Sequence, residues 1–424
     1  MSQGDAFTWE VSATWAIAAL ATFGVIARPW NLPEFIWAVA GAALLVAFKL
    51  LPWPVALAAA GRGTDVYLFL IGMMLLAEVA RKVGLFDWLA VQAVRSSKGS
   101  AKRLFLIVYV VGIVVTVLLS NDATAVVLTP AVYAATRAAK VEPRPYLFAC
   151  AFIANAASFV LPISNPANLV VFGKQMPPLA EWLHAFALPS LAAIVTTYLA
   201  LRLTQRRTLD GSVAAIGAIT PLTRAGKLTA TGILTTAVVL LTASAMDRDL
   251  GLPTFIAGAA ITVLVLAVGR QSPWPVLRDV SWSVLPLVAG LFVLVEGLNQ
   301  TGVLPALART LKKASIVAPQ FTSWIAGVVV AVASNLLNNL PMGLIAATTS
   351  QAAQVARHVT AAILIGVDLG PNLSVTGSLA TILWLIVLRR EGEHVGALQF
   401  LRIGLFVMPP ALLLSLAALA FVAP

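Results

Sequence analysis

Two short polar clusters interrupt long apolar stretches at corresponding places in the chain. Ser120-Asn121-Asp122 follows Leu118-Leu119, and Asn338-Asn339 follows Leu336-Leu337. Amide and hydroxyl side chains supply hydrogen-bond donors and acceptors together, which suits a small polar solute that must be bound and released. An enzyme site here would need clustered Arg, Glu or His, and these clusters hold mainly Asn and Ser. The residue types therefore predict binding rather than bond-breaking chemistry.

Two carboxylates, Asp122 and Asp368, lie in polar interruptions of this kind and far from the basic runs of the chain. A carboxylate in an apolar environment is costly, and where one occurs it often relays protons or binds cations. We therefore predict proton coupling, with Asp122 as the first candidate and Asp368 as the second. The alternative for each residue is a structural helix cap.

Each polar cluster is followed by a segment that we expect to form a helix broken in its middle. The first reads LPISNPAN at 161–168, and the second reads DLGPNLSVTGS at 368–378. Proline removes an amide donor, glycine loosens a helix, and Ser, Asn and Asp compete for backbone hydrogen bonds. Surface loops and simple proline kinks are the alternatives. Four breaks at matched places favour one shared site between two repeats.

Identical residues recur with a separation of 218 and indicate a duplicated chain. The recurring pairs are Gly72/Gly290, Glu78/Glu296, Gly84/Gly302, Leu89/Leu307, Ala90/Ala308 and Asn121/Asn339. We expect a first inverted repeat at 1–203, a cytoplasmic linker at 204–226 and a second inverted repeat at 227–424. The shared position of Glu78 and Glu296 favours a structural role for both, such as pairing with a neighbouring arginine.

The composition indicates an integral membrane protein. Of 424 residues, 60% are hydrophobic and 11% are charged, whereas a soluble domain is about 45–50% apolar and about 25% charged. The mean hydropathy is +0.93. Apolar spans are expected at 11–27, 33–48, 65–80, 145–161, 180–201, 228–245, 253–269, 282–297, 359–369 and 399–421.

The predicted fold class is therefore an all-α integral membrane protein, an inverted-repeat secondary transporter with about ten transmembrane helices. It would contain two re-entrant hairpins, at 104–138 and 320–356, and two broken helices, at 145–175 and 359–389. Polar hairpin tips favour the re-entrant form, because irregular backbone at membrane depth is tolerated where protein lines a cavity.

The distribution of Lys and Arg predicts how the chain is oriented in the cell (inner) membrane. Basic residues collect in cytoplasmic loops, and the cytoplasmic set would be Arg81, Lys82, Arg95, Lys98, Lys102, Arg103, Arg137, Lys140, Arg144, Arg202, Arg206, Arg207, Arg224 and Lys227. Parity then places both termini outside. It also places Arg309, Lys312 and Lys313 outside, on a short amphipathic stretch, 303–313, that we expect at the membrane interface.

Several other classes of protein are disfavoured. The net charge of +11 is explained by positive cytoplasmic loops rather than by a nucleic-acid partner. The lone Cys150 forms no internal disulfide or thiolate cage. The sequence has no G-x-x-x-x-G-K-[ST], H-E-x-x-H or G-x-S-x-G motif. We therefore predict no enzyme activity, no cofactor, no metal site and membrane lipid as the surroundings.

Four stretches together resemble arsenite efflux pumps of the ArsB type, within the ion transporter superfamily. They are SNDATAVVLTP from 120, ANAASFVLPISNPANLVVF at 154–172, SNLLNNLPM at 334–342 and GVDLGPNLSVTGSLATILW at 366–384. The resemblance covers nearly the whole chain. It implies proton-driven export of arsenite, and of antimonite, by alternating access. Some members of this family also work with a soluble arsenite-stimulated ATPase on the cytoplasmic side.

The resemblance also implies a set of site residues. Substrate would be bound by Ser120, Asn121, Thr124, Ser164, Asn165, Asn168, Asn335, Asn338, Asn339, Asn372, Ser374, Thr376 and Ser378. Protons would be carried by Asp122 and Asp368. Arsenite near neutral pH resembles a small uncharged trihydroxide, which hydroxyl and amide groups can hold.

Three other functions stay open at the level of sequence. Another transporter of the superfamily could couple sodium to an organic anion or export silicic acid. The lack of a buried Arg or Lys beside these motifs disfavours a dicarboxylate substrate. An intramembrane enzyme and a channel are less well supported, the first because the hairpin tips lack clustered Arg, Glu or His.

Overall fold

The computed structural model describes residues 3–214 and 221–422, and its regular elements are helices, with one isolated antiparallel bridge between Ser100 and Ser212. The helices of the first half are α1 (Gln3–Ala27), α2 (Glu34–Ala47), α3 (Trp53–Gly61), α4 (Thr64–Lys82), α5 (Leu85–Ser96), α6 (Ala101–Leu118), α7 (Asn121–Ala123), the π-helical turn η2 (Thr124–Leu128), α8 (Thr129–Ala138), α9 (Arg144–Ala156), α10 (Pro166–Phe172) and α11 (Leu179–Thr204).

The second half follows the same order. Its helices are α12 (Arg224–Ala245), α13 (Gly251–Gly269), α14 (Trp274–Asp279), α15 (Val284–Gln300), α16 (Val303–Val317), α17 (Pro319–Leu337), α18 (Asn339–Ala353), α19 (Arg357–Leu369), α20 (Leu379–Arg390) and α21 (Ala397–Val422). Short 3-10 turns lie at Pro29–Asn31, Pro162–Ser164, Gly173–Gln175, Thr208–Asp210 and Gly370–Asn372.

The described helices make this a multi-pass membrane protein. Eight are long and apolar enough to cross a membrane, or nine if α3 and α4, which meet at a bend of 46°, form one span. Two further expected spans fall on α9 and α19, which have 13 residues each. At 1.5 Å per residue, such a helix is about 20 Å long and is too short to cross a hydrocarbon core of about 30 Å alone.

Helix boundaries repeat along the chain, but with two different separations. α11 and α21 begin at 179 and 397 and end at 204 and 422, so both ends are 218 residues apart. α9 and α19 begin at 144 and 357 and end at 156 and 369, so both ends are 213 apart. α10 and α20 also begin 213 apart, at 166 and 379. The broken segments therefore follow the 213 spacing.

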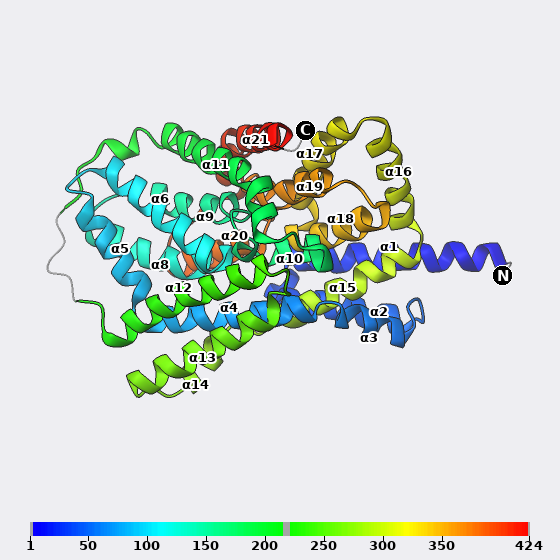
Figure 1. Cartoon of the computed structure of the whole chain (residues 1–424), viewed down its shortest axis with the longest axis horizontal. Helices are drawn as coiled ribbons and strands as arrows, with labels where there is room; N and C mark the ends of the chain where they lie inside the picture. Colours follow the sequence, from blue (N-terminus) through cyan, green and yellow to red (C-terminus); the bar gives the residue numbers. More distant parts are fainter. Residues whose placement is uncertain (1–2, 215–220, 423–424) are drawn as a thin grey trace.

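In the part of the fold formed by the first four helices of each half, the fourth helix of each half packs among the first three helices of the other half. α1, α2 and α3 pack around α15 of the second half, and α12, α13 and α14 pack around α4 of the first half. Figure 1 shows these two groups at the right and left of the lower side of the molecule. We call these two groups of helices the exchanged bundles.

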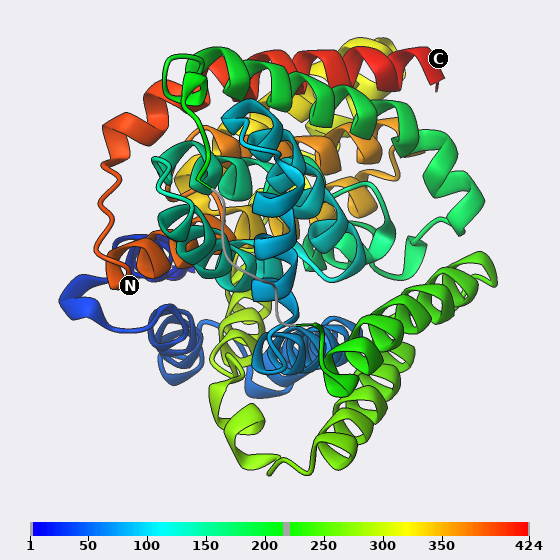
Figure 2. The same ribbon diagram turned by 90° about the vertical axis from the view of Figure 1, so that its left-hand side faces the viewer.

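A pair of long helices, α11 and α21, covers the opposite side of the molecule. They lie side by side along the top of Figure 2, and Ser415 Oγ donates to Pro189 O at 3.0 Å between them. The polar breaks lie between this pair and the exchanged bundles, on segments α6–α10 and α17–α20 (Figure 1). The buried ring of Phe400 on α21 packs against those of Phe148 and Phe152 on α9 and Trp384 on α20.

The connection between the halves lies against both ends of the segment 99–139. Val213 N donates to Gly99 O at 3.0 Å, and Ala214 N donates to Ala139 O at 2.9 Å. Lys102 also pairs with Asp210 at 2.6 Å. The start and the end of this segment therefore lie on the same side of the molecule, as a chain that enters and returns requires.

Close helix crossings in the exchanged bundles depend on the repeated glycines Gly72 and Gly290. A Cβ at Gly72 would overlap the carbonyl group of Thr254 on α13, and one at Gly290 would lie 2.7 Å from the carbonyl carbon of Ala38 on α2. We predict that Gly72→Leu and Gly290→Leu each destabilise the protein by about 1–3 kcal/mol or more, since overpacking displaces backbone. Thermal unfolding in detergent measures this loss.

The matched control for these variants is Gly61→Ala, because nothing lies within 4 Å of a Cβ at Gly61. Its unfolding temperature should stay close to that of the wild type. Equal unfolding temperatures for Gly72→Leu, Gly290→Leu and wild type would contradict the close crossings.

Candidate functional site

The first polar cluster forms the start of a helix, and its side chains accept hydrogen bonds from neighbouring backbone amides. Ser120 Oγ accepts from Ala123 N at 3.2 Å, and Asn121 Oδ1 accepts from Asp122 N at 2.9 Å. The π-helical turn η2 follows and ends just before Pro130, which lacks an amide donor. π-helical turns are rare in proteins, and those that do occur are often found at functional sites. The chain is therefore irregular directly beside Asp122.

Thr124 is held within this irregular turn. Its hydroxyl lies 2.8 Å from the hydroxyl of Thr116 on α6, and its carbonyl accepts from Thr129 Oγ1 at 3.2 Å. Both threonine side chains of the first contact are fully buried. Thr124 thus joins the two arms of the segment on either side of the polar cluster.

The second polar cluster is strained and bonded to the second break. Asn338 has φ 71° and ψ 151°, a region that residues other than glycine seldom occupy. Its Nδ2 donates to Thr376 O at 3.2 Å, and its Oδ1 accepts from Leu340 N at 3.4 Å. Asn339 N donates to Gly377 O at 2.8 Å. These contacts hold the tip against the second broken helix.

The break between α9 and α10 is filled by asparagine and serine side chains. Asn168 Nδ2 lies within 3.2 Å of the carbonyl oxygens of Ser158, Leu161 and Pro162. Ser164 Oγ donates to Val117 O, at the end of α6, at 3.3 Å. Leu161 O also accepts from Ser164 N at 3.1 Å, and the side chains supply further donors where the regular helical amides are missing.

The break between α19 and α20 is joined to α17 in a similar way. Asn335 Nδ2 donates to the carbonyls of Ala331 at 2.8 Å and Gly370 at 3.0 Å, while its Oδ1 accepts from Ser374 at 2.7 Å. Thr376 Oγ1 donates to Asn335 O at 3.1 Å. Val117 and Asn335 are 218 apart, so equivalent carbonyls accept a hydroxyl from the break in each half.

The two broken helices also bond to each other across the halves. Asn165 Nδ2 donates to Asp368 Oδ1 at 2.7 Å. Asn155 Nδ2 donates to Asn372 Oδ1 at 3.0 Å, and Ser378 Oγ donates to Asn155 Oδ1 at 3.3 Å. Hydrogen bonds thus join the two breaks to each other, the first break to the end of α6 and the second break to the second tip. The structure brings together the segments that carry the predicted site residues.

Sequence reasoning missed Asn155, which is 1% exposed and joins Asn372 to Ser378. It also missed Thr381, whose hydroxyl lies 2.8 Å from that of Ser378. Asn155 is a polar residue inside a helix whose last 12 residues are all buried. That isolation in an apolar helix was the signal that could have identified it.

A cavity of about 610 Å³, here called cavity 1, opens beside the first polar cluster. Its walls come from α4, the η2 and α8 region, the α14–α15 connection and α20. Ser120 and Asp122 line it, and the other thirteen predicted site residues are not among its lining residues. Those thirteen lie at or near the two tips and the two breaks, where most of them make the contacts described above.

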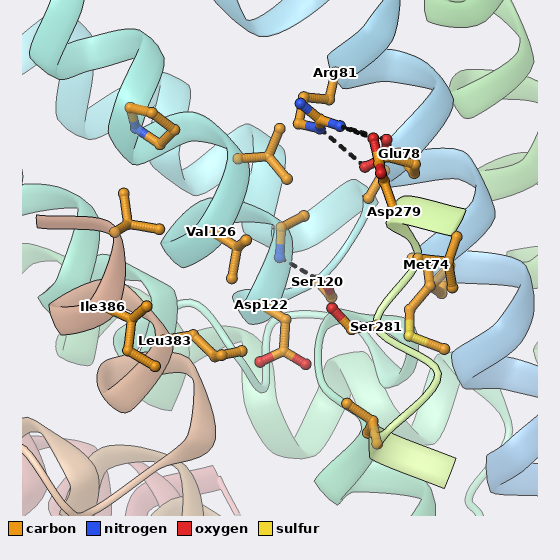
Figure 3. Close-up of a pocket in the computed structure, with 18 of the residues that line it drawn as sticks. Met74, Glu78, Arg81, Ser120, Asp122, Val126, Asp279, Ser281, Leu383 and Ile386 are labelled. Atoms are coloured by element: carbon orange, nitrogen blue, oxygen red, sulfur yellow. Dashed lines mark hydrogen bonds and ion pairs between the residues drawn. The ribbon is translucent and has the colours of Figure 1, made fainter. Parts of the chain in front are cut away.

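Asp122 is half-buried and directed into cavity 1. Figure 3 shows its carboxylate between Leu383 and Ser281. Within the described residues, no hydrogen bond or ion pair involves the Asp122 carboxylate. The charged residues that line cavity 1 are four acids and two bases: Glu78, Asp122, Asp279, Glu391, Arg81 and Arg390. The cavity therefore carries an excess of negative charge.

A second cavity of about 1170 Å³, here called cavity 2, is lined by the equivalent positions of the other half. The pairs of lining residues 218 apart are Glu78/Glu296, Met74/Phe292, Ala77/Val295, Val126/Leu344, Pro130/Thr348, Gly61/Asp279, Arg62/Val280, Val66/Val284, Leu169/Val387 and Gly173/Glu391. The position equivalent to Asp122 is Leu340. Only cavity 1 therefore has a carboxylate at this place in the repeat.

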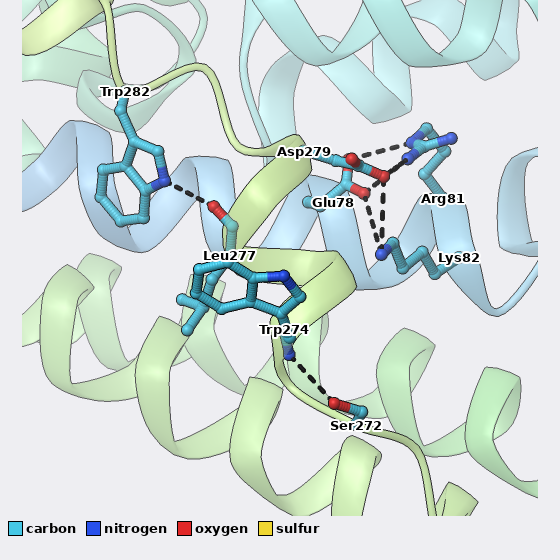
Figure 4. A network of polar contacts seen from close by, with 8 residues as sticks. All are labelled: Glu78, Arg81, Lys82, Ser272, Trp274, Leu277, Asp279 and Trp282. Atoms are coloured by element: carbon cyan, nitrogen blue, oxygen red, sulfur yellow. Dashed lines mark hydrogen bonds and ion pairs between the residues drawn. The ribbon is translucent and has the colours of Figure 1, made fainter.

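The repeated glutamates form ion pairs in the walls of the two cavities, which confirms the structural role predicted for them. Glu78 accepts from Arg81 at 2.6 and 2.9 Å, and Arg81 also lies 3.1 Å from Asp279 of α14 (Figure 4). Glu296 pairs with Arg62 at 2.5 Å. In each exchanged bundle, an arginine thus joins the central helix to the neighbouring short helix or the residue that follows it.

Comparison with known proteins gives one family and several relatives. A profile of the citrate transporter family (CitMHS) matches residues 18–367. The arsenical pump membrane protein of Yersinia enterocolitica is 29% identical over 369 residues, covering 82% of this chain and 84% of that protein. The protein of the same name from Escherichia coli K12 is 27% identical over 367 residues, with the same coverage. An uncharacterised transporter of Mycobacterium tuberculosis is 26% identical over 371 residues, covering 83% and 84%.

One solved structure is similar over nearly its whole length. The YdaH transporter of Alcanivorax borkumensis, whose topology is described as unusual, aligns with a TM-score of 0.58 at 16% identity, covering 91% of this chain and 97% of that one. At this identity the likeness shows a shared fold. The predicted all-α transporter fold and the predicted likeness to arsenite pumps are both confirmed.

The Asn335 side chain on α17 is bonded to Ala331, Gly370 and Ser374, so its loss should be costly. We predict that Asn335→Leu destabilises the protein by about 1–3 kcal/mol for each buried group left unpaired. Thermal unfolding in detergent tests this, with the exposed Gln271→Leu as a control for the same change of chemistry. An Asn335→Leu protein as stable as the control would contradict a structural role for this amide.

Proposed function

The chain belongs to the citrate transporter (CitMHS) family, and on that premise we propose that it exports trivalent arsenic, as arsenite and antimonite, in exchange for protons. The relatives named as arsenical pump membrane proteins support an arsenic substrate. Proton exchange is proposed chiefly because of Asp122, whose carboxylate lies in the wall of cavity 1 and has no hydrogen-bond or ion-pair partner among the residues that the structure describes. Its neighbours Ser120 and Asn121 supply a hydroxyl and an amide.

The charge of cavity 1 supports a neutral substrate rather than citrate. Binding a citrate anion would require cationic groups to balance its carboxylates. Of the two arginines in cavity 1, Arg81 is already bound to Glu78 and Asp279. Of the four acids in the same walls, Glu78 and Asp279 are paired with Arg81. Asp122 and Glu391 then outnumber the remaining base, Arg390, so an anion would meet a net negative charge. An uncharged trihydroxide meets no such repulsion and can use hydroxyl and amide groups.

Two cavities lined by equivalent positions support alternating access by inverted repeats. Asp122 lines cavity 1, whereas residues of α10 and α18 such as Leu169, Val170 and Leu344 line cavity 2. We propose that arsenite enters cavity 1 from the cytoplasm and leaves through cavity 2. In this orientation in the cell (inner) membrane, both termini are external, and residues 204–226 are cytoplasmic.

Asp122 would take a proton from outside when the cavities exchange access and release it to the cytoplasm before the next arsenite binds. The site residues at the breaks would contribute by keeping the tips in place and by presenting Asn and Ser groups once the helices move. Asp368 stays the second candidate for proton coupling. A soluble arsenite-stimulated ATPase stays a predicted partner for the cytoplasmic loops.

Asp122→Asn is predicted to abolish arsenite transport driven by a proton gradient, because an amide of the same size cannot carry the proton. The measurement is arsenite uptake by proteoliposomes under an imposed pH gradient, with a thermal unfolding curve to establish that the variant folds. Glu391→Gln is the matched control, since it removes an exposed carboxylate from the same cavity and should keep transport. Uptake by Asp122→Asn equal to that of the wild type would contradict the assignment of Asp122 as the proton carrier.

Substrate competition tests the neutral-substrate argument in the same proteoliposomes. Antimonite should compete with arsenite, whereas a tenfold excess of citrate should leave arsenite uptake unchanged. Silicic acid, another neutral hydroxide, is the informative alternative competitor. Inhibition by citrate at concentrations comparable to arsenite would show that the acidic cavity does not exclude anions.

A further inference from the structure

The two broken helices are equivalent at a separation of 213, and this spacing pairs residues that the 218 spacing leaves unrelated. Asn165 and Ser378 are 213 apart, and each is the residue directly before the second segment of its broken helix. Each caps that segment, Asn165 through Ala167 N at 3.0 Å and Ser378 through Thr381 N at 3.1 Å. They are therefore equivalent both in place and in role.

Asn155 and Asp368 are also 213 apart. Asn155 is the second-last residue of α9, and Asp368 is the second-last residue of α19. Both are 1% exposed. Each lies ten residues before the capping residue of its own half. The first half thus has an amide where the second half has a carboxyl group.

These four residues form two crossed hydrogen bonds between the halves. The capping residue Asn165 donates to Asp368 Oδ1 at 2.7 Å, and the capping residue Ser378 donates to Asn155 Oδ1 at 3.3 Å. In each bond the capping side chain of one broken helix donates to the first segment of the other. Equivalent positions of the two halves therefore form the same kind of bond twice across their interface.

We propose that Asn155 and Asp368 are a matched pair of positioning residues, each of which accepts a hydrogen bond that fixes the capping residue of the opposite broken helix. Asn155 Nδ2 also donates to Asn372 Oδ1, and the Nδ2 of Asn372 donates to Phe152 O at 3.0 Å. The amide of Asn155 thus fixes two points of the second break, on either side of its irregular backbone. Asp368 fixes one point of the first break.

The chemistry of the position explains why an amide and a carboxyl group can be equivalent there. The shared requirement is an oxygen that accepts from the capping side chain, and Asn and Asp both supply one. Asn155 does not titrate, and Asp368 is not among the residues that line cavity 1 or cavity 2. Proton carriage by Asp368 is the competing role, and it predicts the opposite result in the experiment below.

The consequence for transport is that each bond fixes the break of one half against the first segment of the other, so loss of either bond should lower transport. This consequence rests on the proposed function, whereas the bonds themselves do not. The experiment therefore has a part without substrate and a part with arsenite.

The part without substrate uses double-mutant cycles on thermal unfolding of the detergent-solubilised protein. Asn165→Ala with Asp368→Leu, and Ser378→Ala with Asn155→Leu, should be clearly less destabilising together than the sum of the single changes. The matched control is the mispaired combination Asn165→Ala with Ser378→Ala, whose effects should add. Additive effects in both bonded pairs would overturn the proposal, whatever the substrate of the protein is.

The part with arsenite compares conservative and non-conservative variants of Asp368 in everted vesicles. Asp368→Asn keeps an acceptor oxygen and should recover most of the uptake lost in Asp368→Leu, with the pH profile of the wild type. Asn155→Leu should lower uptake at least tenfold at low arsenite concentration. An Asp368→Asn protein that folds yet has lost proton-driven uptake, as completely as Asp368→Leu, would overturn positioning in favour of proton carriage. Failure of the wild type to move arsenite would count against the proposed function alone, because the double-mutant cycles are measured by thermal unfolding without substrate.

Discussion

The need to satisfy backbone groups without water governs the centre of this protein. A broken helix exposes carbonyls and amides that an apolar environment cannot hydrate, and each unpaired group is costly. Here Asn168 donates to the carbonyls of the first break, while Asn335 donates to a carbonyl of the second. An amide side chain resembles a peptide group, so asparagine can replace backbone partners on both its donor and acceptor sides. This requirement explains why asparagine recurs at the two tips and the two breaks.

The same constraint joins the halves into one structure. The first break bonds to the end of α6, the second break bonds to the second tip, and the two breaks bond to each other through buried side chains. The exchanged bundles connect the halves a second time, because α4 and α15 each pack among helices of the other half. The acidic cavity beside Asp122 lies between these two systems. A solute reaching Asp122 would thus meet irregular backbone on one side and regular helices on the other.

Much of the fold could be predicted from the sequence because its signals are local. Apolar length, repeated glycines, and Pro and Gly within helices indicate spans, duplication and breaks without knowledge of partners. The pairs formed by the breaks could not be predicted in this way. Ser378 and Asn155 are 223 residues apart, and their bond depends on how two halves pack. The 218 spacing also hid the equivalence of Asn155 and Asp368, because the broken segments follow the 213 spacing.

The candidate site illustrates a second limit of sequence reasoning. Residue types identified Asp122, and the structure places its carboxylate in a cavity without a partner. The same residue types also identified Asn335 and Asn168, whose amides are bonded to backbone carbonyls. An asparagine that binds a solute and one that completes a broken helix are identical in sequence. Whether these amides also contact substrate stays a prediction.

Arsenite accumulation in everted membrane vesicles containing the wild-type protein tests the central claim, proton-driven export of trivalent arsenic, most directly. Vesicles would be energised with and without an uncoupler that collapses the proton gradient, and vesicles lacking the protein would give the background. The account predicts accumulation above background that the uncoupler abolishes and that replacement of sodium by choline leaves intact. No accumulation in vesicles with demonstrated protein and proton gradient, or accumulation that requires sodium, would contradict it.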